Sequence, residues 1–305
     1  MKKTIILFWM LFIVVNMEAQ INMNDSTAQV IAYWNLNEKQ TYQVTTEKYK
    51  IVDSDTTVTE YFKYLVDITV KDSTNNSYTV DWFYHAYEIN EENELLKKLS
   101  TLVEDMTITI RTDETGVLQE VVNWKDIQAF VFKATQILRE ETMDIPNIDK
   151  VITQIENMYT SKESIEAAAI REIQLFHTFH GAKYKMNLEY NSPLKIANLY
   201  GDEPFDADAI VWLDEINPDD NNFILRMNLA VNSEQLTKTT FNYLTDIAKK
   251  MNTPAPKWEE FPQLKNETFT ASRIHGSGWP IYCIETKEIF VEGQTNIEET
   301  IIEIQ

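Results

Sequence analysis

Between residues 41 and 111, hydrophobic and polar residues alternate with a period of two, which is the pattern of half-buried β-strands. The clearest run covers residues 58–70, where one face, broken by Glu60, carries Val58, Phe62, Tyr64, Val66, Ile68 and Val70. The polar segment 72–77 separates this run from a second alternating run at 78–84. We therefore expect the two runs to pair as an antiparallel hairpin.

The period then changes to three and four residues, which predicts amphipathic helices. Asn123 is a suitable N-cap for the first helix, and Thr160 with Glu163 has the spacing of a capping box for the third. Gly181 is the expected stop of that third helix. The four predicted helices cover residues 124–141, 148–159, 160–181 and 233–251.

Strands resume in the second half, at residues 183–190, 209–216, 223–231, 267–274, 279–291 and 298–304. Because strands come in runs and do not alternate singly with helices, the pattern predicts an α+β fold. We expect a large antiparallel, curved β-sheet packed against a segregated layer of about four amphipathic helices. Residues 20–305 are expected to form a single body, in which two similar lobes could meet near residue 181.

A short sequence recurs in both halves: Thr115, Gly116 and Val117 resemble Ser277, Gly278 and Trp279. Each triplet combines a hydroxyl residue, a glycine and an apolar residue, as expected of a turn. Three residues are too few to establish an internal repeat.

The N-terminus has the three parts of a secretory signal: Lys2 and Lys3, eleven apolar residues at 5–15, and a polar region ending near Ala19. Eleven apolar residues are about half of the ~20 that a membrane-spanning helix needs. We therefore expect residues 1–19 to be removed and the mature chain to have no membrane span. Since no cysteine lies near the cut, the product is expected to be periplasmic or extracellular and not lipid-anchored.

The net charge of the chain disfavours some classes of binding partner. The chain carries 27 basic and 48 acidic residues, a formal charge of −21, which disfavours nucleic acid and anionic lipid head groups. A high net charge also keeps a protein soluble, and this alone explains the acidity without any specific partner. Cys283 is the only cysteine, so no internal disulfide can form.

Two clusters contain residue types that bind metal ions. His177 and His180 could present two nitrogens to zinc, but zinc generally takes three or four protein ligands. Histidines before a terminating glycine more simply interact with the helix dipole. The acidic residues between 202 and 220 lack the loop register of a calcium site. No metal site is predicted.

No catalytic residue is assigned. The sequence His275-Gly276-Ser277-Gly278 precedes a strand and not a helix, so a tight hairpin is favoured over a serine nucleophile. His85 could act as a general base, although an exposed or cross-strand paired histidine is commoner. With six glycines and no glycine-rich phosphate loop, no cofactor is expected.

Aromatic residues are the remaining candidates for binding. A cavity for an apolar guest could be lined by Trp82, Tyr84, Trp124, Phe130 and Phe132. A large sheet packed on helices needs the same residues for its core, and core packing is the favoured interpretation.

The segment Glu18-Ala19-Gln20, the charged strand-rich body and Ser277-Gly278-Trp279-Pro280 resemble uncharacterised exported proteins of the Bacteroidota type. That resemblance implies no activity. A curved sheet closing over helices is similar in shape to periplasmic lipoprotein carriers, and shape alone does not give function. The leading hypothesis is a non-enzymatic envelope protein that binds a lipid or other apolar or amphipathic molecule between sheet and helices. A structural or protein-interaction module of the envelope comes second, and a hydrolase of unknown type third.

Overall fold

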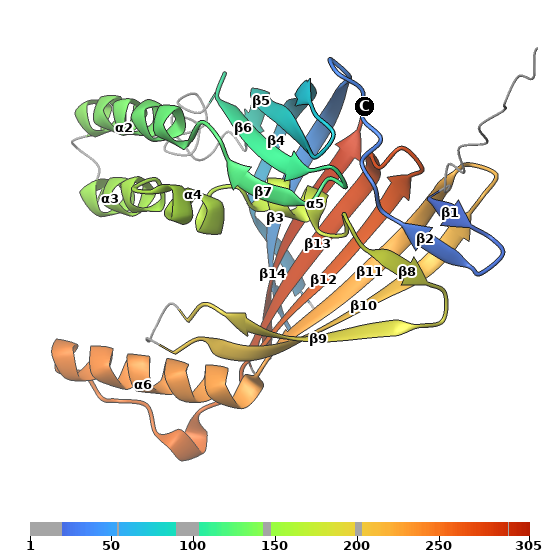
Figure 1. The fold of residues 1–305 in the computed structure, drawn as a ribbon. Helices are drawn as coiled ribbons and strands as arrows, with labels where there is room; N and C mark the ends of the chain where they lie inside the picture. The colour runs from blue at the N-terminus through green and yellow to red at the C-terminus, as the bar shows by residue number, and fades with distance from the viewer. Residues whose placement is uncertain (1–19, 54, 90–103, 143–147, 199–202, 292) are drawn as a thin grey trace, which may run out of the picture.

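The fold was determined as a computed structural model, which describes residues 20–53, 55–89, 104–142, 148–198, 203–291 and 293–305 (Figure 1). The predicted signal segment 1–19 lies outside the described residues. The described chain is α+β and dominated by antiparallel strands, as the alternating pattern predicts.

Eleven antiparallel strands of the described chain form one sheet, in the order β7-β6-β5-β4-β3-β14-β13-β12-β11-β10-β9. The order shows two meanders, β3 to β7 and β9 to β14, joined where β14 pairs with β3 between Gln294↔Val52 and Ile304↔Tyr42. The strands are β3 (Lys39–Val52), β4 (Asp55–Ser73), β5 (Ser77–Ile89), β6 (Thr107–Asp113), β7 (Leu118–Val121), β9 (Glu189–Ile196), β10 (Phe205–Asn217), β11 (Asn222–Val231), β12 (Lys265–His275), β13 (Pro280–Val291) and β14 (Gln294–Ile304).

A second, three-stranded sheet joins the beginning of the described chain to its middle. It consists of β1 (Ile21–Asn22), β2 (Thr27–Gln29) and β8 (Lys183–Lys185), with β2 in the centre. The predicted strand 183–190 is therefore divided, since β8 belongs to the small sheet and β9 to the large one.

Five helices lie in the described residues: α2 (Trp124–Glu141), α3 (Ile148–Met158), α4 (Lys162–Ala168), α5 (Arg171–His177) and α6 (Ser233–Met251), with a short 3₁₀ turn η1 (Trp258–Glu260). Helices α2, α3 and α4 lie together, and α6 lies apart from them near the other end of the sheet (Figure 1). Among the described residues, no helix combines the length and apolarity needed to cross a bilayer.

The predicted third helix is wrong in detail, because the chain breaks at Ala169 and Ile170 into α4 and α5. In one straight helix Ile165 and Ile170 would point about 140° apart, given 3.6 residues per turn. The break allows both side chains, and that of Ile173, to be fully buried. The cap is also displaced by one residue, since the Ser161 hydroxyl accepts the backbone N–H of Ser164.

The main core lies where the β3–β6 region meets helices α2 to α5. Alternate residues of neighbouring strands are fully buried there, including Tyr42, Val44, Val66, Ile68 and Trp82. Val58 does not share this face, contrary to the alternating pattern, and is 56% exposed. Lys48 pairs with Glu60 and Tyr49 with Val58, so Thr59 forms a bulge. One extra residue reverses the alternation and turns Val58 to the opposite side.

The two recurring triplets form turns with the same hydrogen bonds. In the first, Asp113 N–H donates to the Val117 carbonyl (3.0 Å) and Gly116 N–H to the Asp113 carbonyl (3.2 Å). In the second, His275 N–H donates to the Trp279 carbonyl (3.0 Å) and Gly278 N–H to the His275 carbonyl (2.8 Å). Both glycines have positive φ, 94° and 85°, a conformation that side chains disfavour. The predicted tight hairpin at residues 275–278 is confirmed.

Candidate ligand-binding site

The structure brings four of the five predicted aromatic residues to one core. Trp82 is fully buried and Tyr84 is 3% exposed, while Trp124 and Phe130 of α2 pack on the same core and remain partly exposed. Phe132 is not among the residues that pack there. It follows Phe130 by two positions, which places it about 200° around the helix.

The carboxylate of Glu172 lies at the edge of this core, a position that the sequence pattern does not indicate. The hydroxyl of Tyr84 on β5 donates to Oε1 of Glu172 on α5 at 2.7 Å, across 88 residues of sequence. Three further tyrosines, all partly buried against the main core, interact electrostatically with the same carboxylate. We call Tyr64, Tyr84, Tyr87 and Tyr159, together with Glu172, the tyrosine cluster.

A bulge in β5 assembles the sheet side of the cluster. Leu65 pairs with His85 and Lys63 with Glu88, so Ala86 and Tyr87 both lie opposite Tyr64. Ala86 has φ 55°, a left-handed conformation that is uncommon for alanine and costs local strain. The Tyr64 ring consequently stacks on Tyr87, with centroids 5.0 Å apart, and is tilted against Tyr84 at 5.8 Å.

Burial governs the electrostatics of the cluster. Burial raises the pKa of Glu172. The Tyr84 hydrogen bond and the charge of Arg171 lower this pKa again, but only in part. Burial also raises the pKa of Tyr64 and Tyr84 well above the ordinary value, and the nearby Glu172 charge adds to the effect. For Tyr159 the same two causes raise the pKa to about 12. The tyrosines are therefore neutral donors and aromatic walls at physiological pH.

The neighbouring Arg171 does not neutralise Glu172 by a direct contact. Its Nε and Nη2 donate to Glu285 Oε1 at 3.0 and 2.7 Å, and its Nη1 donates to Glu298 Oε1 at 2.6 Å. Arg171 thus ties α5 to β13 and β14. Within the described residues, Glu172 takes part in no ion pair at contact distance.

The two histidines of the predicted third helix are not charges at a helix end. Both are 6% exposed, and burial lowers the pKa of His177 well below its ordinary value and that of His180 to about 4. His180 also lies beyond the end of α5. Their rings contact the two glycine turns, through the carbonyls of Gly116 and Gly278. No group of three or more metal-ligating side chains is present in the part of the chain that the structure describes.

The other candidate residues have local structural contacts. His85 Nε2 lies 3.5 Å from Asp67 Oδ2, and that carboxylate already binds Lys39 and Thr41. His275 Nδ1 lies 2.8 Å from the Ser277 hydroxyl, within the hairpin. In the acidic segment, Asp206 binds Lys195 and Gln235, and Asp214 accepts from Arg226 at 2.7 Å.

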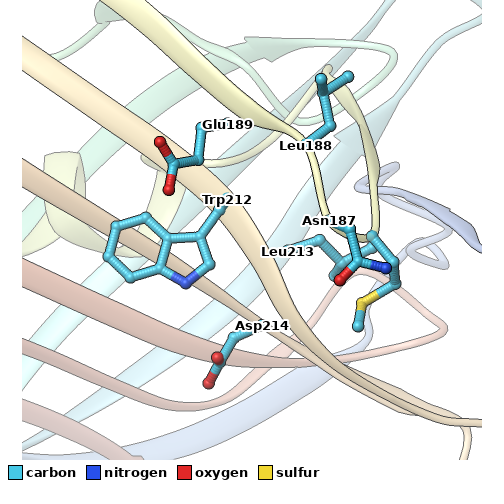
Figure 2. A pocket seen from close by; sticks show the side chains of 7 residues that line it. Asn187, Leu188, Glu189, Trp212, Leu213 and Asp214 are labelled. Atoms are coloured by element: carbon cyan, nitrogen blue, oxygen red, sulfur yellow. The ribbon is translucent and has the colours of Figure 1, made fainter.

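A surface hollow of about 530 Å³ lies between the β8–β9 connection and β10 (Figure 2). Figure 2 shows the indole of Trp212 between the carboxylates of Glu189 and Asp214, with Asn187 on the connecting loop. Five strands separate β10 from β4, so this hollow is distinct from the tyrosine cluster. The sequence pattern does not single out Trp212, because this residue lies within the continuous apolar run 209–213 of β10.

Neither a scan against protein-family models nor a search of curated proteins found a match to this chain.

Proposed function

We propose that this chain is a non-enzymatic, exported envelope protein that binds an amphipathic ligand between the sheet and the helices. The observation that carries the proposal is the Tyr84–Glu172 contact at the margin of the main apolar core. Small-molecule sites combine mostly apolar and aromatic walls with a few placed polar groups. The tyrosine cluster has this composition, with Trp124 and Phe130 of α2 packed on the same core.

A curved sheet with its helices as a separate layer belongs to the proposal. Register shifts interrupt the pairing of β3 with β4, β6 with β7, β10 with β11 and β12 with β13 at one position each, and the pairing of β4 with β5 at two. Each such irregularity bends a strand and increases its local twist. Bending at these six places supports a sheet that wraps around a ligand on its helix-facing side.

The assignment as non-enzymatic is supported by the positions of the histidines, which are the commonest general bases. His177 and His180 are buried against glycine carbonyls, His275 is part of a hairpin, and His85 lies beside an Asp67 that is already bound.

Export is supported by the signal pattern in residues 1–19 and is tested by the N-terminal sequence of the protein isolated from its source.

Native mass spectrometry of the purified full chain tests the ligand. We expect a bound amphipathic molecule that organic solvent extracts, and a rise in the midpoint of thermal unfolding when amphipaths are added to the stripped protein. Replacing Tyr159 by Ala should weaken this binding, whereas replacing the exposed Tyr243 of α6 by Ala should not. A chain that carries no amphipath and shows no shift with any would overturn the proposal.

A second candidate function, an interaction module of the envelope, is favoured by a different surface. On the side of the sheet opposite the helices, cross-strand pairs align apolar residues over β13, β14, β3 and β4, namely Phe290, Ile51, Ile297, Tyr49 and Val58. Phe290 and Val58 are 40% and 56% exposed. A photo-crosslinking residue at position 58 should then give a discrete protein adduct in cells, and one at the exposed Met251 should not. Absence of an adduct at position 58 would exclude this candidate.

A further inference from the structure

We propose that the tyrosine cluster binds a cationic head group, an alkylammonium, and that Glu172 supplies the opposing charge. This inference rests on the proposed function and specifies the class of its ligand. The ammonium group would lie against the free side of the Glu172 carboxylate and the faces of the surrounding rings. The apolar part of the molecule would extend along the aromatic residues at the margin of the main core.

The first argument is charge. Glu172 is a carboxylate at the edge of an apolar core, where an unpaired charge is costly. The nearest cation in sequence, Arg171, directs its guanidinium to Glu285 and Glu298 instead. Among the side chains of the described residues, the Tyr84 hydroxyl alone donates to the Glu172 carboxylate, beside the backbone N–H of Glu172 itself. A bound cation would supply the missing partner.

The second argument is that aromatic side chains surround the Glu172 carboxylate. Aromatic faces attract cations through the ring quadrupole, and rings arranged around an ammonium group are a recurring mode of recognition. Here Tyr64 lies against both Tyr87 and Tyr84, and Tyr159 reaches the cluster from the end of α3.

The third argument is access. Tyr84 forms a closed floor at 3% exposure, whereas Tyr64, Tyr87, Tyr159 and Glu172 each retain accessible surface. The cluster is therefore closed at Tyr84 and keeps accessible surface at its other members. The strained Ala86 that places Tyr87 over Tyr64 is consistent with a functional arrangement of these rings.

An anionic head group has a different place to bind. A hollow of about 270 Å³ on the helix-facing side of β3, β13 and β14 is lined by Lys48, Lys50 and Lys287, beside Ile289 and Glu298. Lys48 is already paired with Glu60 at 2.7 Å, and Glu298 is paired with Arg171. Because the carboxylate of Glu172 would repel an anion, the two sites make opposite predictions about head-group charge.

Titration calorimetry of the full chain with three probes of equal alkyl length tests the inference. The probes are dodecyltrimethylammonium, dodecyl maltoside and dodecyl sulfate, each below its micellar concentration. A chain of charge −21 attracts cations nonspecifically, so the titrations are run at 0.3 M salt, where exposed charges are screened within a few ångströms. We expect one site at which the cation binds about tenfold more tightly than the neutral probe.

Two variants locate that preference. Glu172→Gln should remove the preference for the cation while leaving the affinity for the neutral probe, and Glu163→Gln, at an exposed carboxylate of α4, should preserve both. If Glu172→Gln does not fold, Tyr159→Leu keeps the volume and removes a ring, and should lower cation affinity about threefold to tenfold. Circular dichroism and the unfolding midpoint establish the folding of each variant.

The outcomes separate this inference from the function on which it rests. Equal affinity for the cation and the neutral probe, or a preference that persists in Glu172→Gln, would overturn the inference and leave the proposed function intact. Tightest binding of dodecyl sulfate, lost in Lys287→Gln, would place an anionic head group in the lysine-lined hollow and overturn the inference as well. Binding of none of the three probes would overturn both.

Discussion

His177 and His180 are three residues apart with ring centroids 5.1 Å from each other, and each ring bonds to a different glycine turn. His177 Nδ1 lies 2.8 Å from the Gly116 carbonyl, and His180 Nε2 lies 3.0 Å from the Gly278 carbonyl. The chain between Val30 and Trp34 also bonds to both turns, through Ala32 N–H to Thr115 and Tyr33 N–H to Ser277. One short segment thus connects the edge hairpin β6–β7 with the central hairpin β12–β13.

These contacts predict opposite tautomers for the two rings. A carbonyl oxygen only accepts, so the nitrogen facing it must carry the proton. His177 should therefore be protonated at Nδ1 and His180 at Nε2. Long-range ¹H–¹⁵N correlation spectra of histidine-labelled protein at pH 7 distinguish the two forms, and finding the same tautomer in both rings would contradict the arrangement.

The same burial predicts loss of stability in mild acid. Because the pKa of His180 falls from 6.5 to about 4 on folding, the unfolded chain binds more protons than the folded chain between these values. His177 acts in the same direction, and Glu172, with its raised pKa, in the opposite one. The free energy of unfolding should fall by about 3 kcal/mol from pH 7 to pH 4 through His180 alone.

Urea unfolding at pH 7, 5.5 and 4.5 measures this dependence. In His180→Gln the part of the slope between pH 6.5 and 4.5 that His180 contributes should disappear. An identical slope in wild type and variant would show that the ring is not held neutral.

Substitution of the turn glycines should be costly for two separable reasons. A Cβ on Gly278 would lie 2.3 Å from the Ile31 carbonyl oxygen, and one on Gly116 would lie 2.5 Å from His180 Cδ2. Gly293, with φ 75° and no atom within 4 Å of a built Cβ, is the matched control for conformation alone. Gly293→Ala should cost about 1 kcal/mol and Gly278→Ala about 3 kcal/mol or more, by chemical denaturation. Equal costs would mean that the close approach is absent.

Cys283 should be unreactive in the folded protein. It is fully buried, and burial raises the pKa of its thiol to about 12, so almost no thiolate forms at neutral pH. Its Sγ accepts from the Ser272 hydroxyl at 3.3 Å. Maleimide labelling at pH 7.5 should proceed only at the rate of unfolding and become immediate in urea. Fast labelling of the native chain would show that β13 opens locally.

Loss of Arg171 should loosen α5 from the sheet. The side chain is 43% exposed, so solvent screening limits the two ion pairs to about 1 kcal/mol in total. Arg171→Met keeps the aliphatic stem and should destabilise by that amount, while Arg226→Met, which breaks one exposed pair with Asp214, should cost less than half as much. Thermal unfolding of both variants compares them, and equal shifts would argue against a linking role for Arg171.

Much of the secondary structure follows from the sequence. Residues 124–141 and 233–251 coincide with α2 and α6, because each has a continuous stripe of apolar residues and a clear start or stop. The alternating runs coincide with strands, and the two glycine triplets with turns, because both patterns arise from neighbouring residues.

The tertiary structure decided where those local patterns fail. The bulge at Thr59 turned Val58 outward, and the break at Ala169 divided one expected helix into two so that three isoleucines could be buried. Tyr84 and Glu172 met across 88 residues, although neither strand nor helix periodicity marks a carboxylate on a buried face. Periodicity reports which residues share a face of one element. Periodicity does not report which faces of different elements meet, or which polar groups must then find partners. Both depend on the burial of surface between elements that are distant in the chain.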